Sequence, residues 1–141
     1  RKTDVSGNVS YIAAMKPVRL ALNEMLRHLA EKESVVMDGR DIGSYVLPNA
    51  EVKIFQIASP EIRAKRRYDE DQEKGIPATY EEVLEEVKKR DYIDSHRDFD
   101  PLIAAEDSIS LDTSSMNIEE VVDAILKIVK EKTGLERKTC H

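Results

Sequence analysis

Segments with helical apolar spacing alternate along this chain with short runs of β-branched and aromatic residues, and this alternation constrains the fold more than any other feature. Helical spacing occurs in residues 17–33, 60–73, 80–91 and 117–129. Short apolar runs occur in residues 35–37, 52–57 and 108–111. Strands that alternate with helices predict an α/β domain with a mostly parallel sheet. The continuous run Val35-Val36-Met37 predicts a strand buried on both faces.

Local start signals support three of these helices. Ser59 followed by Pro60 is a typical helix start, because the serine oxygen accepts from a free backbone N–H and proline suits the first turn. Thr79 and Asn117 each precede a glutamate by three residues, which is the spacing of a capping box. We therefore predict that these residues mark the beginnings of three helices.

The composition excludes several classes of partner. The chain has 141 residues, with 22 Lys and Arg against 28 Asp and Glu and a formal net charge of −6, which argues against a nucleic-acid polymer as partner. No apolar run approaches the roughly 18 residues of a membrane span, and no leader peptide is visible, so we expect no membrane association. A single cysteine, Cys140, fits a reducing, cytoplasmic location. The histidines His28, His96 and His141 lack partners at ligand spacing, so no metal site is expected.

The five glycines limit the kind of nucleotide site that the chain can contain. They stand at positions 7, 39, 43, 75 and 134, and this spacing forms neither a G-x-x-x-x-G-K-[ST] loop nor a G-x-G-x-x-G fingerprint. A G-x-S-x-G nucleophile motif is also absent from the sequence. The remaining candidates for chemistry are arginines that stand next to carboxylates.

The first candidate is Asp38-Gly39-Arg40-Asp41, which follows a predicted buried strand. Ligands of open parallel sheets bind at this end of the strands. Gly39 permits a sharp turn of the backbone, while Arg40 offers a forked donor and Asp41 an acceptor. The alternative is a surface turn with a local ion pair of little energetic value.

The second candidate is Arg90, Asp94 and Arg97, which share one face if the helix continues through them. Two guanidinium groups on one face can hold a phosphate, and the aspartate can accept from a sugar hydroxyl. The alternative is a solvated ladder of ion pairs.

The third candidate is a basic segment with four cations, namely Arg63, Lys65, Arg66 and Arg67. Acidic residues follow at once, so part of this charge is neutralised along the helix. The break at Gly75-Ile76-Pro77 makes the segment a plausible flap over a polyphosphate.

Six segments, taken in order, carry a family resemblance. They are Ser10 with the small residues after it, Pro-Val-Arg at 17–19, Asp-Gly-Arg-Asp-Ile-Gly at 38–43, Val-Lys-Ile-Phe at 52–55, Arg-Ala-Lys-Arg-Arg at 63–67 and Lys-Arg-Asp-Tyr-Ile-Asp-Ser-His-Arg at 89–97. This combination resembles the bacterial cytidylate kinase family, in the nucleoside monophosphate kinase branch of the P-loop fold. The resemblance extends to about residue 131.

The resemblance implies an incomplete P-loop nucleoside monophosphate kinase fold, with a mostly parallel sheet flanked by helices and a short lid. Residues 1–15 would be the end of the monophosphate-binding region, 16–132 the core with a lid near 66–78, and 133–141 a tail. In the family the phosphate-cradling loop lies near the N-terminus, whereas this sequence starts at Arg1 and has no such loop. We therefore expect this chain to be the later part of such an enzyme and to be inactive by itself.

The resemblance also implies a pocket for cytosine. By similarity, Ser10 and Asp41 accept hydrogen bonds from the N4 amino group of cytosine. Arg19 donates to the other ring acceptors, with Arg97 nearby. Uracil would set its O4 against a carboxylate and leave a buried group unpaired, which costs about 1–3 kcal/mol.

The remaining implied roles concern the phosphates and the ribose. Arg40 and Arg90 grip the monophosphate, and Asp94 accepts from ribose hydroxyls. Arg66 and Arg67 are the implied catalytic residues, which close with the lid and stabilise charge on the transferring phosphoryl group.

The implied reaction is ATP + CMP or dCMP giving ADP and the corresponding diphosphate. ATP is the co-substrate, and Mg²⁺ is expected to be held mainly by the missing part and by the nucleotide phosphates. The partners are then CMP or dCMP and ATP, and a monomer is expected for the intact protein. Two alternatives stay open: a non-catalytic nucleotide-binding module derived from the family, and a structural relic whose arginines form only surface ion pairs.

Overall fold

The computed structural model describes residues 11–135, so Ser10, Cys140, His141 and most of the predicted tail lie outside the described residues. The elements follow one another as α2 (Lys16–Lys32), the single π-helical turn η1 (Ile42–Val46), β1 (Ile54–Ile57), α3 (Pro60–Glu73), α4 (Tyr80–His96), β2 (Ile109–Asp112) and α5 (Ile118–Thr133). This order confirms the predicted α/β class.

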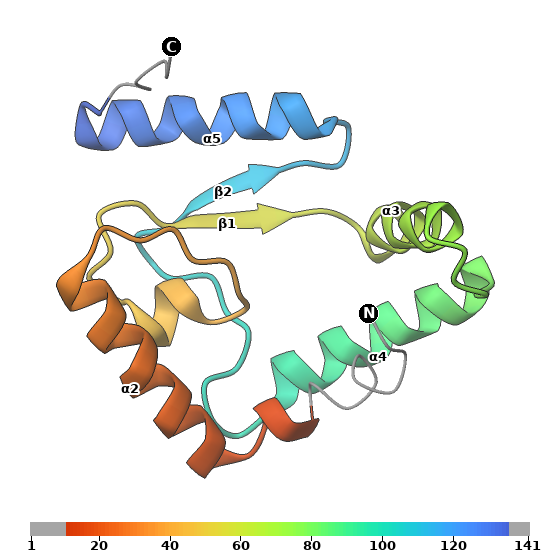
Figure 1. The fold of residues 1–141 in the computed structure, drawn as a ribbon, viewed down its shortest axis with the longest axis horizontal. Helices are drawn as coiled ribbons and strands as arrows, with labels where there is room; N and C mark the ends of the chain where they lie inside the picture. Colours follow the sequence, from red (N-terminus) through yellow and green to blue (C-terminus); the bar gives the residue numbers. More distant parts are fainter. Residues whose placement is uncertain (1–10, 136–141) are drawn as a thin grey trace.

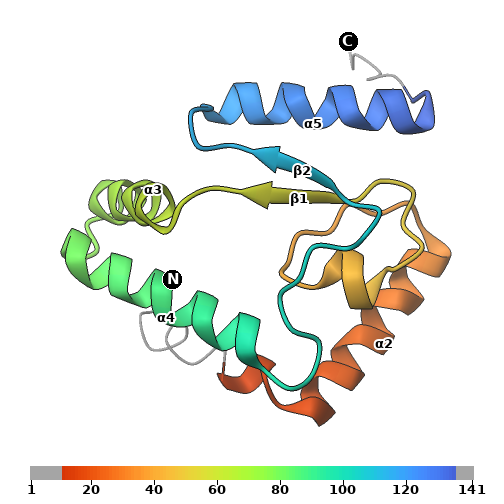
Figure 2. The ribbon, with the colours of Figure 1, turned by 180° about the vertical axis from the view of Figure 1, so that it is seen from behind.

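The strands β1 and β2 pair in parallel and form the sheet of the described part of the chain. Ile54 stands opposite Ile109 in this register. Lys53 links the segments that precede the two strands, because its buried Nζ lies 2.7 Å from both carboxylate oxygens of Asp107. In Figures 1 and 2, α5 lies along the β2 side of the sheet, whereas α2 and the end of α4 lie on the other side.

The predicted buried strand at 35–37 is wrong. Residues 34–38 have no regular structure, and the side chain of Val36 is fully exposed. A strand needs a neighbour to accept and donate its backbone hydrogen bonds. Within residues 11–135, the sheet has only the two strands β1 and β2, so Val35–Met37 finds no such neighbour there.

Helices α3 and α4 form a hairpin with its own apolar core. The hydroxyl of Ser59 caps α3 by accepting from the backbone N–H of Ile62, and Thr79 forms a complete capping box with Glu82 at the start of α4. The two predicted starts are thereby confirmed. Three small or β-branched side chains fill the space between the helices: Ala64, Val83 and Val87.

Helix α4 is longer than the periodicity alone predicts. It continues past Asp91 to His96, whose ring stacks on Tyr92 with 4.1 Å between the ring centroids. The extra turn keeps Arg90 and Asp94 on one helix and leaves Arg97 at its C-terminal cap. The helix therefore continues through Arg90 and Asp94 as the second candidate group requires, but it ends one residue before Arg97.

Helix α5 begins at the predicted cap, where Asn117 and Glu120 form a capping box, and ends at Gly134 in the left-handed conformation. None of its residues is buried, and its apolar residue Ile118 is 83% exposed. No helix in residues 11–135 is long and apolar enough to cross a membrane.

Replacing Val83 with alanine should lower the free energy of unfolding by about 2 kcal/mol, because a side chain 3% exposed would leave a cavity in the hairpin core. Urea denaturation monitored by circular dichroism measures this change. Val122→Ala on α5 is the matched control, since Val122 is 46% exposed, and it should change stability by less than about 0.5 kcal/mol. Equal losses for the two variants would contradict this description of the core.

Candidate functional site

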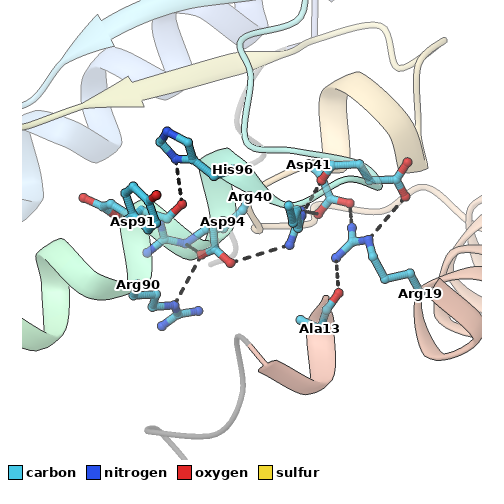
Figure 3. Close-up of polar contacts among 11 residues, drawn as sticks. Ala13, Arg19, Arg40, Asp41, Arg90, Asp91, Asp94 and His96 are labelled. Carbon is cyan, nitrogen blue, oxygen red and sulfur yellow. Dashed lines mark hydrogen bonds and ion pairs between the residues drawn. The ribbon is translucent and has the colours of Figure 1, made fainter. Parts of the chain in front are cut away.

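Arginine and aspartate side chains meet where α2, the 38–41 turn and the C-terminal end of α4 come together (Figure 3). We call this group the arginine–aspartate cluster. Its members are Arg19, Arg40, Arg90, Arg97, Asp41, Asp91, Asp94 and Asp100.

The ion pair between Arg19 and Asp41 lies at the centre of the cluster. Both residues are buried, with 6% and 8% of their surfaces exposed. Arg19 also donates from Nη1 to the carbonyl oxygen of Ala13 at 3.0 Å. Asp41 is held by its backbone, since its carbonyl accepts from the N–H groups of Tyr45 and Val46 in η1.

Gly39 gives the 38–41 turn its shape for a reason of space. A Cβ at this position would lie 2.7 Å from Cγ1 of Ile42, the first residue of η1. That distance is shorter than any ordinary contact, so a side chain here would displace Ile42 and with it the neighbouring Asp41. The glycine is therefore required by close approach.

Arg40 joins the turn to helix α4 through two carboxylates. Its Nη1 donates to Asp91 at 2.8 Å, and its Nε lies 3.0 Å from Oδ2 of Asp94. Asp91 is shared with Arg63 of α3, which holds both carboxylate oxygens at 2.9 and 2.5 Å. Burial raises the pKa of Asp91, but hydrogen bonds from Arg63 and Arg40 outweigh that effect and hold this pKa below its usual value.

The side chain of Arg97 is buried in the cluster, with 4% of it exposed. Its Nη1 is 3.5 Å from Asp94 and its Nη2 is 3.7 Å from Asp41. Burial, followed by the nearby charge of Arg19, lowers the pKa of Arg97. Two neighbouring buried cations therefore depend on the surrounding carboxylates.

Several buried polar atoms of the cluster have only ion-pair partners. Among residues 11–135, Asp41 Oδ2, Asp94 Oδ2 and Arg97 Nη2 are buried and make ion pairs but no hydrogen bond of good geometry. Buried polar atoms normally have hydrogen-bond partners, so part of the hydrogen-bonding capacity of these three atoms is unused in the cluster. A hollow of about 460 Å³ opens beside Arg97, and its other lining residues are Ala14, Lys16, His96, Asp98 and Phe99.

The structure brings together six of the nine residues predicted for the site: Arg19, Arg40, Asp41, Arg90, Asp94 and Arg97. Ser10 lies outside the described residues. Arg66 and Arg67 are engaged elsewhere, so their catalytic role stays a prediction. Arg66 donates to the carbonyl oxygens of Thr113 and Met116, and Arg67 lies 3.3 Å from Glu86 of α4.

Sequence reasoning missed three members or supports of this site, namely Asn23, Asp91 and Asp100, and it assigned Arg63 to a basic flap and not to this site. Asn23 could have been found, because it lies one helical turn after Arg19 on the same face of α2. Arg63 and Asp91 pair across 28 positions of sequence, and Asp100 reaches Arg19 across 81, which no local pattern reveals. Among residues 11–135, no group of three or more His, Cys, Asp or Glu side chains is placed to hold a metal ion.

The fold and the cluster together define an α/β protein with a largely buried group of paired arginines and aspartates. A family model described as cytidylate kinase matches residues 1–131. The chain belongs to the cytidylate kinase family.

Curated relatives named cytidylate kinase show the extent of the match. The protein of Anoxybacillus flavithermus is 52% identical over 132 residues, which cover 94% of this chain and 59% of the relative. The protein of Bacillus subtilis is 50% identical over 133 residues, with the same two coverages. The protein of Clostridium tetani is 51% identical over 138 residues, covering 98% of this chain and 61% of the relative. The chain thus spans about three fifths of the length of these relatives, in their C-terminal part.

Replacing Asp91 with asparagine should lower the free energy of unfolding at neutral pH by about 2 kcal/mol, because two guanidinium groups lose a charged partner. A carboxyl whose pKa is lowered on folding stabilises the fold above its unfolded pKa and loses that contribution as the pH falls through its folded pKa. The difference between the wild type and Asp91→Asn should therefore shrink in acid. Urea titrations at a series of pH values measure it, and a difference that stays constant into acid would contradict the assignment.

Proposed function

We propose that this chain is the later part of a cytidylate kinase, which transfers a phosphoryl group from ATP to CMP or dCMP. The observation that carries this proposal is the buried Asp41 acceptor with Arg19 and Arg97 on either side of it. The phosphate-cradling loop would come from the part of the relatives that this chain does not cover. We propose a cytoplasmic monomer for the whole protein.

Cytosine recognition would use the chemistry of this buried group. The N4 amino group of cytosine is a donor, and the carboxylate of Asp41 is an acceptor, whose Oδ2 forms an ion pair with Arg19 but no hydrogen bond of good geometry among the described residues. Arg19 and Arg97 would donate to O2 and N3 of the ring. Ser10, which lies outside the described residues, would be a second acceptor for N4. Uracil offers an acceptor where cytosine offers this donor, so the same carboxylate would reject it.

The phosphate of CMP would compete with carboxylates for the arginines. Arg40 is neutralised by Asp91 and Asp94, and Arg90 lies 3.7 Å from Asp94. A phosphate dianion offers more charge and more acceptor oxygens than a single carboxylate does. Its arrival would free Asp94 to accept from ribose hydroxyls.

The transfer step would be a direct in-line displacement. An oxygen of the CMP phosphate attacks the γ-phosphorus of ATP, and the bond from that phosphorus to the β–γ bridging oxygen breaks as ADP leaves with the electron pair. Arg66 and Arg67 would stabilise the transferring group once the lid near 66–78 closes, which requires them to leave Thr113, Met116 and Glu86. Mg²⁺ neutralises phosphate charge in such reactions. It would be held by the nucleotide phosphates and by the segment of the whole kinase that lies outside this chain's match to its relatives.

A second candidate function is a non-catalytic nucleotide-binding module. It is favoured by one observation, namely that these 141 residues contain no G-x-x-x-x-G-K-[ST] loop. Reading the coding sequence upstream of Arg1 separates the two candidates. An in-frame loop of this kind supports the kinase, and an initiator codon directly before Arg1 supports the module.

Asp41→Asn should lower kcat/KM for CMP about 10- to 100-fold in the protein translated from its complete reading frame, because the amide replaces one acceptor of the N4 donor. The preference for CMP over UMP should fall with it. Coupled assays of ADP release with both nucleotides measure these values. Asp123→Asn, an exposed carboxylate on α5, is the control and should leave both unchanged. Unchanged discrimination in Asp41→Asn would overturn the assignment of Asp41.

A further inference from the structure

Asp100 has an unusual backbone for an aspartate. Its φ is 49°, and among residues 11–135 it is the one non-glycine residue with a positive φ. The left-handed conformation costs an ordinary residue roughly 1–2 kcal/mol, although aspartate tolerates it better than most. The turn is closed by a hydrogen bond of 2.7 Å from the backbone N–H of Leu102 to the carbonyl oxygen of Asp94. It delivers a carboxylate that is only 7% exposed into the cluster.

Asp100 contacts both arginines that flank Asp41. Its Oδ2 accepts from Nε of Arg19 at 3.3 Å and from Nδ2 of Asn23 at 3.0 Å. Its backbone carbonyl accepts from Nε of Arg97 at 2.5 Å. Asp100 therefore accepts a hydrogen bond from the Nε–H group of each of the two arginines.

These contacts determine which atoms the arginines present. A guanidinium group is planar, so fixing Nε fixes the directions of the two Nη atoms. With Nε of Arg19 held by Asp100, its Nη atoms face Ala13 and Asp41. With Nε of Arg97 held by Asp100, its Nη atoms lie near Asp94 and Asp41. The contacts of Asp100 with the two Nε atoms thus orient the Nη donors that lie next to Asp41.

Asp100 also supplies charge at the moment when Asp41 is used by a ligand. If Asp41 turns to a donor on the ligand, Arg19 loses part of its partner while it stays buried. The carboxylate of Asp100 lies on the Nε side of Arg19 and can keep its contact. A buried cation without an anion is strongly destabilising, so this second carboxylate lowers the free-energy cost of the exchange at Asp41.

We propose that Asp100 is a positioning residue for base recognition, which holds Arg19 and Arg97 so that their Nη donors and the Asp41 acceptor form one recognition edge. The inference rests on the proposed function. Asp100 would act through the arginines and would not touch the nucleotide. Its loss should weaken the binding of CMP much more than it slows the transfer step.

Two variants of the protein translated from its complete reading frame test this inference. Asp100→Gly removes the carboxylate that accepts from Arg19, keeps the backbone carbonyl that accepts from Arg97, and suits the positive φ, so it adds no backbone strain. Asp100→Asn also tolerates this backbone and keeps one acceptor for Arg19. Glu106→Gly, at an exposed glutamate in the same connection to β2, is the control for a lost charge and a gained glycine.

The readouts are the Kd of CMP and UMP from calorimetry, the KM and kcat for CMP, and the urea midpoint of each variant. In Asp100→Gly, the Kd and KM for CMP should rise about 10- to 100-fold with a much smaller change in kcat. The Kd and KM of Asp100→Asn for CMP should lie between those of Asp100→Gly and the wild type, and those of Glu106→Gly should match the wild type. This pattern would support the positioning role.

The contrary results are distinct from one another. If the wild type shows no saturable binding of CMP, the proposed function fails and the inference fails with it. If the wild type binds CMP and folded Asp100→Gly and Asp100→Asn bind it equally well, only the inference is overturned, whatever the change in urea midpoint. If Asp100→Gly does not fold, the Kd of Asp100→Asn decides in the same way.

Discussion

Two arginine side chains lose almost all contact with water in this fold, and the carboxylates around them make that burial possible. Arg19 lies on α2 and Arg97 at the C-terminal cap of α4, and Asp41, Asp94 and Asp100 compensate them. A buried guanidinium without these partners would cost several kcal/mol. Because the carboxylates belong to different segments, charge compensation holds α2, the 38–41 turn and the end of α4 in their mutual arrangement.

The apolar part of the structure is small by comparison and is concentrated elsewhere. The α3–α4 hairpin has its own core, whereas α2 and α5 carry exposed apolar residues such as Met25 and Ile118. The chain spans about three fifths of the length of its relatives. In the proposed function, these surfaces would pack against the segment of the whole kinase that corresponds to the part of the relatives outside the match. The charged cluster, in contrast, is already assembled from residues of this chain alone.

Sequence reasoning succeeded where the physics is local and failed where it is not. The starts of α3, α4 and α5 were predictable because a cap and its partner lie three residues apart. The strand expected at 35–37 failed because a strand exists only beside another strand, which the pattern of Val35–Met37 does not reveal. Six residues proposed from motifs lie together in the cluster, but the contact of Asp100 with Arg19 spans 81 positions of sequence and has no local pattern.

The tight contact at Gly39 has a consequence for how this turn tolerates mutation. Gly43, four residues later, has room for a methyl group, because the nearest atom to a Cβ there is in the flexible stem of Lys53 at 3.4 Å. A Cβ at position 39 would lie 2.7 Å from Cγ1 of Ile42 and would have no such room. A deep mutational scan should thus tolerate alanine at Gly43 in η1 far better than at Gly39 in the turn before it.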